Sequence, residues 1–187
     1  ADAVLESIRG NFRNDVRIKV PLGVEDIIKE VVELLDDDLR SNDIISTIEI
    51  ELENIEIIGD RIQLQQVFIN LISNAIEAMS IVDEYRVLSI RAAIRDDGGV
   101  MISVSDTGAG IDEQNLHQVF NPLFTTKAGG MGMGLSISRS IVEAHGGTMW
   151  VVPNEPRGST FNVVLGVDAA SSPAVECDVR EDNGISN

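Results

Sequence analysis

Apolar residues recur at helical spacing in three stretches of the chain, and each stretch predicts a helix with one buried face. The first helix is expected from Val24 to about Arg40, the second from Asp60 to about Met79, and the third from about Gly134 to His145. Asp60 has the side chain of a good helix N-cap, and Gln63, three residues later, completes the pattern of a capping box.

Alternation of apolar and polar residues predicts short strands. The clearest pair, residues 88–94 and 100–104, surrounds an Asp-Asp-Gly-Gly turn and therefore predicts a hairpin. The order of helices and strands fits an α+β two-layer sandwich, in which a mixed, mostly antiparallel sheet carries about three helices on one face. The other predicted strands are residues 17–20, which Pro21 closes, and residues 48–52, 55–58, 149–152 and 161–165.

The 187 residues suit one domain with short appendages, and we expect the domain to occupy residues 15–167. Residues 1–14 carry apolar side chains at helical spacing, which indicates the end of a helix that began further upstream; residues 168–187 read as a polar tail. The stretch from Asp106 to Gly134 is rich in glycine and has little periodicity apart from a helical patch at 112–119, and such a stretch is usually functional or mobile. No apolar run is long enough to span a bilayer and no signal-peptide pattern opens the sequence, so the chain as given is expected to be soluble. The single cysteine favours a cytoplasmic location, and the full-length protein is expected to be either soluble or membrane-attached.

The charge balance is strongly acidic: 31 acidic residues against 14 basic ones give a formal net charge of -17. Long-range repulsion argues against nucleic acid and against direct membrane contact, because binding to a phosphate backbone needs clustered Lys and Arg. A nucleotide can still bind if a metal ion, backbone N–H groups or a few placed cations neutralise its phosphates. The single cysteine, Cys177, excludes an internal disulfide framework, and two distant histidines do not suggest a histidine-rich metal site.

A stripe of polar side chains follows the second predicted helix. Asn70 and Asn74 are four residues apart and therefore project from one side of that helix. Asparagine is a poor helix former, whereas an amide oxygen is a hard, neutral ligand of the kind that Mg²⁺ accepts. The alternative is that both side chains lie on an ordinary wet helix face, and the stripe alone does not decide between the two interpretations.

A motif with two glycines begins where a predicted strand ends. Asp106 opens an Asp-x-Gly-x-Gly sequence with Gly108 and Gly110. A carboxylate in this place can accept a hydrogen bond from the exocyclic amine of adenine, where guanine has a carbonyl. The glycines let the backbone turn tightly and approach a flat ring. Since Asp-x-Gly-x-Gly is also a common loop, a structural role remains the alternative.

A cluster of glycines at residues 129–134 stands at the start of the third predicted helix. Glycines before a helix N-terminus expose N–H groups to an anion. The cluster is neither a Walker A loop nor a dinucleotide fingerprint, because it lacks a Gly-Lys-Ser/Thr end and an immediately preceding strand. Lys127, just upstream, either offers one cation to the phosphates or is a solvated loop lysine.

The order of these motifs carries more information than any one of them. The Asn-x-x-x-Asn helix, the Asp106 loop, the sequence Phe-Asn-Pro-Leu-Phe-Thr-Thr-Lys at 120–127, the glycine cluster and Gly-Ser-Thr at 158–160 together resemble the ATPase domain of histidine kinases, over roughly residues 15–167. That superfamily also contains DNA gyrase, the heat-shock chaperone ATPases and the mismatch-repair ATPases. The amino-acid sequences of the asparagine helix and of the last helix are similar to those of nitrogen- and oxygen-responsive bacterial kinases. The resemblance implies the Bergerat ATP-binding fold with a long flexible lid, and ATP and Mg²⁺ as ligands.

The resemblance also implies roles for individual residues. Asn74 matches the Mg²⁺ ligand with Asn70 beside it, Asp106 matches the aspartate that reads adenine, and Thr160 matches a residue near the adenine end. Asn70, Asn74 and Lys127 are the implied catalytic residues. The other residues implied to bind the nucleotide are Gly108, Gly110, Phe124, Thr125, Thr126, Gly130, Gly132, Met133, Gly134 and Leu135, with Gly132 and Gly134 facing the phosphates.

Two departures from the family pattern are informative. In the gyrase-like hydrolases a glutamate that activates water stands where this chain has Asn70, and an amide cannot take a proton from water near neutral pH. This difference favours a kinase over a hydrolase. Many histidine kinases carry a lysine where this chain has Glu77, so more of the phosphate charge must fall to Mg²⁺, the lid and Lys127.

A histidine kinase also needs partners that this sequence does not contain. The acceptor histidine of such kinases lies on a dimeric helical hairpin and is typically followed by an acid, whereas His117 precedes a glutamine and His145 precedes a glycine. We therefore expect the acceptor on a separate dimerisation and phospho-acceptor domain of the same full-length protein, and a response regulator downstream. Two other functions stay open: a module that binds ATP without transferring phosphate, and a self-contained ATPase.

Overall fold

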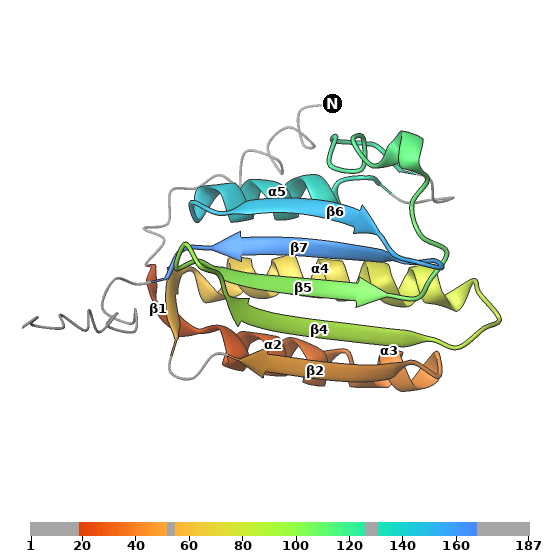
Figure 1. Ribbon diagram of the computed structural model, residues 1–187, viewed down its shortest axis with the longest axis horizontal. Helices are drawn as coiled ribbons and strands as arrows, with labels where there is room; N and C mark the ends of the chain where they lie inside the picture. The colour runs from red at the N-terminus through yellow and green to blue at the C-terminus, as the bar shows by residue number, and fades with distance from the viewer. Residues whose placement is uncertain (1–18, 52–54, 126–130, 168–187) are drawn as a thin grey trace, which may run out of the picture.

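The computed structural model describes residues 19–51, 55–125 and 131–167. Its main sheet has five strands: β2 (Ile45–Glu51), β4 (Val87–Ile94), β5 (Val100–Asp106), β6 (Thr148–Pro153) and β7 (Ser159–Leu165). They lie side by side in the order β2-β4-β5-β7-β6, and the helices pack behind them (Figure 1). Only β2 and β4 run parallel, so the predicted mixed, mostly antiparallel sheet and the two-layer α+β arrangement are confirmed.

The described residues form four α-helices, where about three were predicted, because the first predicted helix is divided. α2 (Val24–Leu34) ends at Leu35, whose ψ of 9° leaves helical geometry, and α3 (Asp36–Ser41) begins directly after it. Three consecutive aspartates open α3, and a helix N-terminus stabilises negative charge, so the acidic run favours a new start over continuation. The second and third predicted helices are confirmed as α4 (Arg61–Ser80) and α5 (Gly134–Ala144).

The helical patch predicted near the middle of the chain also differs from the structure. The patch expected at 112–119 is a single 3-10 turn, Glu113–Asn115, after which Gln118 and Val119 both donate to the carbonyl of Asn115 and the chain continues in turns. None of the described helices has the length and apolar character needed to cross a membrane. The segments expected at residues 1–14 and 168–187 lie outside the described residues.

A second, two-stranded sheet joins β1 (Val20–Gly23) to β3 (Glu56–Gly59) in antiparallel register. The prediction that Pro21 closes the first strand is wrong, because the strand continues through this residue. Within the described part of the chain β1 pairs with β3 alone, and such an edge strand tolerates a residue that lacks a backbone N–H.

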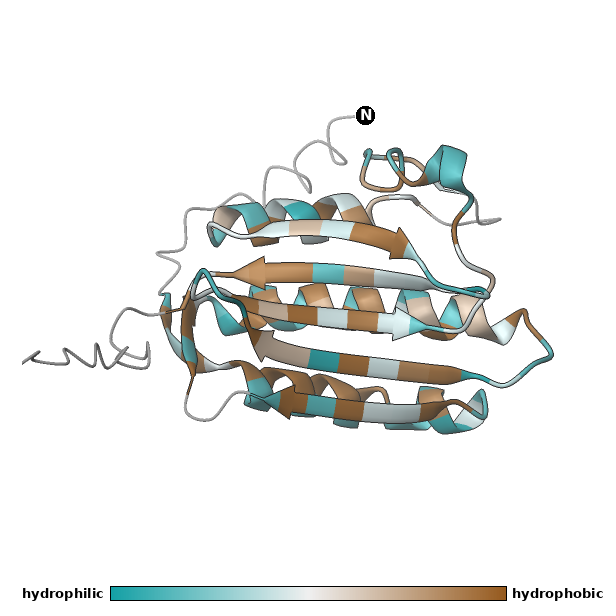
Figure 2. Ribbon diagram, in the orientation of Figure 1, coloured by the Kyte–Doolittle hydropathy of each residue, from teal (hydrophilic) through white to brown (hydrophobic). Residues whose placement is uncertain are grey.

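The core lies between α4 and the main sheet. Figure 2 shows hydrophobic residues recurring along α4 where it passes behind β5 and β7. On β5, Val100, Ile102 and Val104 are buried and alternate with half-buried residues, as the strand period requires. The predicted apolar stripe of α4 is confirmed, since these of its residues are buried: Leu64, Val67, Phe68, Leu71, Ile72, Ala75, Ile76 and Met79.

His145 fastens the start of α4 to the end of α5. The Asp60 side chain caps α4 by accepting from the Gln63 N–H at 3.2 Å, which is the first half of the predicted capping box. The Asp60 N–H itself donates to Nε2 of His145 at 3.0 Å. Because Nε2 accepts there, the proton lies on Nδ1, which donates to the carbonyl of Ile141 at 2.7 Å. The imidazole therefore uses both ring nitrogens to join two helix ends.

We predict that His145→Ala lowers the free energy of unfolding by about 1–3 kcal/mol, because the partly buried Asp60 N–H loses its acceptor. His117→Ala is the matched control: this histidine is exposed and should change stability by less than about 0.5 kcal/mol. Urea unfolding followed by circular dichroism measures both variants. Equal stabilities for the two variants would contradict the bridging role.

Candidate functional site

The described part of the chain contains a cavity of about 460 Å³ between α4, the end of β5 and the start of α5. One wall carries Asn70 and Asn74 of α4, another carries Asp106 at the end of β5, and a third carries Gly132 and Gly134. These residues lie far apart in sequence. The fold brings them together because α4 passes behind β5 and packs against α5.

Asp106 is a buried carboxylate, only 3% exposed, at the inner end of this cavity. Burial raises its pKa from the ordinary value of 3.8, while backbone N–H groups of Gly108 and Ser159 oppose that rise. The Gly108 N–H donates to Oδ1 at 2.8 Å. Both N–H groups hold the carboxyl in one orientation and still leave it facing the cavity.

The glycines around Asp106 are required by close backbone approaches. A Cβ on Gly108 would lie 2.6 Å from the backbone carbon of Ala78 on α4, where Ala109 also donates to the Ala78 carbonyl. A Cβ on Gly158 would lie 2.0 Å from the carbonyl oxygen of Asp106, and its φ of +100° is itself unfavourable for other residues. Larger side chains at either position would displace the carboxylate.

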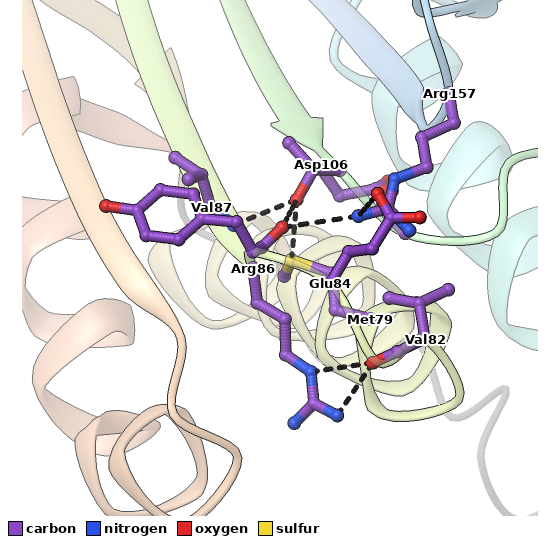
Figure 3. Close-up of polar contacts among 10 residues, drawn as sticks. Met79, Val82, Glu84, Arg86, Val87, Asp106 and Arg157 are labelled. Carbon is purple, nitrogen blue, oxygen red and sulfur yellow. Dashed lines mark hydrogen bonds and ion pairs between the residues drawn. The ribbon is translucent and has the colours of Figure 1, made fainter.

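Thr107, the residue after Asp106, is hydrogen-bonded to the loop that follows α4 and to the start of β4. Its Oγ1 accepts from the Val87 N–H at 2.9 Å and donates to the Tyr85 carbonyl at 3.0 Å. Figure 3 shows Arg157 reaching Glu84 across this loop, at 3.1 Å, and Arg86 donating to the carbonyl of Val82. These bonds join Thr107, directly after β5, to the start of β4 and to the loop that follows α4, and they join that loop to the turn before β7.

The two asparagines are joined to each other and to α5. Asn74 Nδ2 donates to Asn70 Oδ1 at 3.4 Å, and Asn70 Nδ2 donates to Ser138 Oγ at 3.0 Å. Glu77, one turn further along α4, also lines the cavity. Asn70 and Asn74 are half-buried and line the cavity, which favours the ligand interpretation over an ordinary wet helix face.

The start of α5 lines the cavity beside Asn70. No side chain caps its first turn, so its leading N–H groups keep their hydrogen-bonding capacity for an anion. Gly132 has a φ of +63°, and a Cβ there would lie 2.5 Å from the Phe124 carbonyl oxygen. A Cβ on Gly134 would lie 2.3 Å from Oδ1 of Asn70. The two glycines thus bring the helix start against the loop and the asparagines.

An aromatic anchor fixes the segment that leads into this loop. Phe120 meets Phe161 of β7 edge to face, with ring centroids 6.4 Å apart, and the Arg139 guanidinium lies 5.1 Å from the Phe120 centroid. Val119 is buried and also lines the cavity. The predicted aromatic segment therefore packs on both β7 and α5.

The structure brings most of the predicted site residues to one cavity. The lining includes Asn70, Asn74, Asp106, Gly110, Phe124, Thr125, Gly132, Met133, Gly134 and Leu135. Gly108 acts through Asp106 and does not itself line the cavity. Thr126, Lys127 and Gly130 lie outside the described residues.

Thr160 lies on the other side of β7, where its Oγ1 donates to Asn154 Oδ1 at 2.7 Å and meets Ser105 Oγ at 2.9 Å. The residue that lines the cavity is its neighbour Ser159, which is 2% exposed and whose Oγ has no hydrogen-bond partner. Strand alternation places Ser159 on the same face as Phe161, so the sequence contained a signal for this residue that the motif comparison missed.

No group of three or more His, Cys, Asp or Glu side chains suited to a metal occurs within residues 19–51, 55–125 and 131–167. A metal ion in the cavity would therefore take few ligands from these residues. Mg²⁺ fits this arrangement, because it retains several waters and binds substrate phosphates alongside one or two protein oxygens.

Residues 59–169 match the family described as histidine kinase-, DNA gyrase B- and HSP90-like ATPase. Two curated relatives are sensor protein FixL of Bradyrhizobium diazoefficiens, 46% identical over 58% of this chain, and sensor histidine kinase ZraS of Escherichia coli, 45% identical over 60% of it. The aligned parts are 21% and 23% of those proteins, so this chain spans about a fifth of the length of the curated relatives it matches.

Solved structures give the same picture. The catalytic domain of histidine kinase ThkA is 33% identical, with a TM-score of 0.70 over 79% of this chain and 95% of that one. ThkA in complex with the response regulator protein TrrA is 30% identical, with a TM-score of 0.70 over 88% of this chain and 46% of that one. The chain therefore belongs to the family of histidine kinase-, DNA gyrase B- and HSP90-like ATPases, as an ATP-binding catalytic domain of the sensor histidine kinase type.

Proposed function

We propose that this domain holds Mg-ATP and transfers the γ-phosphoryl group to a histidine on the dimerisation and phospho-acceptor domain of the same full-length protein. The observation that carries the proposal is the placement of a buried carboxylate, Asp106, and an amide pair, Asn70 and Asn74, on separate walls of one cavity. The two walls can recognise the two ends of an ATP molecule, and the relatives named above include sensor histidine kinase ZraS and histidine kinase ThkA.

The adenine belongs at the Asp106 end of the cavity. Its exocyclic amine donates to the ionised carboxylate, whereas guanine would present a carbonyl to the same oxygen and be repelled. The unpaired hydroxyl of Ser159 supplies a further hydrogen bond to the base, directly or through a water. This second role replaces the one first expected of Thr160, whose hydroxyl is engaged elsewhere.

The phosphates belong at the other end, against the first turn of α5 and the amide stripe of α4. Gly132 and Gly134 let backbone N–H groups approach the phosphates, and the sequence offers Lys127 as an added cation. Asn74 supplies an amide oxygen to Mg²⁺, whose charge neutralises the phosphates during transfer. Glu77 lines the same cavity and adds negative charge, so this neutralisation matters more here than in a site with a lysine.

Transfer is favoured over hydrolysis because Asn70 cannot act as a base. A neutral imidazole nitrogen of the acceptor uses its own lone pair: the N–P bond forms as the bond from the γ-phosphorus to the bridging oxygen breaks, and ADP leaves with that electron pair. Such a step asks mainly for positioning and charge neutralisation. A response regulator then receives the phosphoryl group, a role consistent with the complex formed by ThkA.

We predict that nucleotide affinity falls at mildly acidic pH. Protonated Asp106 is a neutral and weaker acceptor for the adenine amine and carries an added O–H donor, and because burial raises its pKa the loss begins above the 3.8 of an ordinary aspartate. The stability of the free domain responds in the opposite sense. Because the folded-state pKa of Asp106 is raised, the folded domain favours the protonated carboxyl, and its stability falls as pH rises from the unfolded-state pKa through the folded-state pKa.

Titration calorimetry with a non-hydrolysable ATP analogue between pH 7.5 and 5 measures this dependence, with Asp106→Asn as the reference variant. The variant should bind about 5- to 150-fold more weakly at neutral pH, because an unpaired or misoriented polar contact in a buried site costs about 1–3 kcal/mol. Its remaining affinity should show little of the wild-type pH dependence. An Asp106→Asn protein with wild-type affinity would remove the adenine assignment.

A second prediction separates Ser159 from Thr160. Ser159→Ala should weaken adenine-nucleotide binding about 3- to 10-fold, the worth of one hydrogen bond. Thr160→Val keeps the shape of its side chain, removes a hydroxyl that faces Asn154, and should leave affinity within about twofold. Competition binding against a fluorescent ATP analogue compares the variants, and the reverse ranking would place the adenine end at Thr160.

The proposed activity itself is tested by supplying the purified acceptor hairpin of the full-length protein together with Mg²⁺ and radiolabelled ATP. Wild-type domain should form acid-labile phosphohistidine, and Asn74→Ala should reduce it at least about 100-fold, a typical loss when a metal ligand is removed. Steady phosphate release without any acceptor would instead support a self-contained ATPase. Tight ATP binding with no transfer would support a nucleotide-sensing module.

A further inference from the structure

Ser138 of α5 belongs to none of the nucleotide-binding motifs, yet it is one of only four buried polar residues among those described. Its side chain is 1% exposed, and its Oγ accepts from Asn70 Nδ2 at 3.0 Å. The two residues stand on different helices, 68 positions apart in sequence. A buried hydroxyl that meets a side-chain amide of the active-site helix has the geometry of a positioning group.

The contact continues from Asn70 to Asn74. An amide side chain donates only through its nitrogen and accepts only through its oxygen, which occupy opposite corners of the group. Since Asn70 Nδ2 points to Ser138, its Oδ1 points back to Asn74 and accepts from Nδ2 there at 3.4 Å. The Asn74 nitrogen is thereby turned toward Asn70, and its oxygen is turned to the other side of the amide.

Gly134 makes room for this arrangement. Its Cα stands so close to Asn70 that an added Cβ would lie 2.3 Å from Oδ1 and 3.0 Å from Cγ. Asn70 is therefore enclosed between two residues of α5, one of which accepts from its nitrogen while the other leaves space for its oxygen. The amide of Asn70 has little freedom to rotate while α5 keeps its place.

We propose that Ser138 is a positioning residue for the Mg²⁺ site: through Asn70 it fixes the amide orientation of Asn74, so that the oxygen and not the NH₂ group is directed toward the ion. The inference rests on the proposed function, because it takes Asn74 as a Mg²⁺ ligand. If the Asn74 amide were rotated, its NH₂ group would face the cation, and Mg²⁺ would lose this oxygen ligand. The relay also joins the helix that meets the phosphates to the helix that holds the metal ion.

The test is a Mg²⁺ titration of the 187-residue chain with a non-hydrolysable ATP analogue, followed by calorimetry. Ser138→Ala should raise the Mg²⁺ concentration for half-maximal enhancement of binding about 3- to 10-fold, the effect of one lost hydrogen bond. Analogue affinity in EDTA should stay within about twofold of wild type. A merely structural role would weaken binding equally with and without Mg²⁺.

Ser140→Ala is the matched control, since Ser140 lies on the same helix, is exposed, and donates to the Ser136 carbonyl. It should leave the Mg²⁺ dependence unchanged. In an Asn70→Ala background, where the relay is already broken, Ser138→Ala should cause no further shift. Additive shifts in the double variant would overturn the relay.

A measurement on the wild-type protein covers the case in which Ser138→Ala does not fold. Nuclear Overhauser contacts should join the Asn70 side-chain NH₂ to the Ser138 β-protons, and their absence would overturn the inference. Failure of the proposed function looks different: the wild-type chain would bind the analogue equally well with and without Mg²⁺. If a folded Ser138→Ala protein keeps the wild-type Mg²⁺ dependence, the positioning role of Ser138 is contradicted and the proposed function is not.

Discussion

Burial of the apolar stripe of α4 is the constraint from which the site follows. Leu64, Phe68, Leu71 and Ile72 are all within 1% of complete burial, so the rotation of the helix about its axis is set by the core. Asn70 and Asn74 occupy the adjoining stripe of the same rigid helix and must therefore project beside the end of β5. Replacing two amides by other polar residues would leave the packing intact and remove the chemistry, which is why the fold alone does not specify the function.

At the cavity wall that carries Asp106, the cost of burying a charge is balanced against hydrogen bonds from the backbone. Asp106 is buried at a cost to the folded state, because desolvation disfavours its charge. Backbone N–H groups from Gly108 and Ser159 offset part of that cost, and they reach the carboxyl only because Gly108 and Gly158 allow backbone to approach within contact distance. A ligand that donates a hydrogen bond to this carboxyl would relieve part of the remaining cost. Under the proposed function, the burial that weakens the empty domain would therefore strengthen discrimination for adenine.

Local pattern predicted the helices, the hairpin and the motif residues, because each depends on neighbours within a few positions. It failed where a distant contact or a subtle local balance decided the outcome. The break at Leu35 follows from three aspartates that favour a new helix start, and Pro21 is accepted because its strand pairs on one side only. Ser159 was within reach, since alternation from Phe161 identifies it. Ser138 and the bridging role of His145 were not, because each depends on a partner more than sixty residues away.

The strongly acidic composition and the site are consistent with each other once the source of positive charge is considered. With a formal net charge of -17 and Glu77 in the cavity wall, long-range attraction cannot gather a triphosphate. Under the proposed function, recognition would instead use short-range dipoles, namely the first N–H groups of α5, together with an ion that arrives with the nucleotide. Such a site gains affinity only when the amides and the helix start are already aligned. A hydroxyl that holds Asn70 in one orientation therefore contributes more here than it would in a site supplied with several lysines.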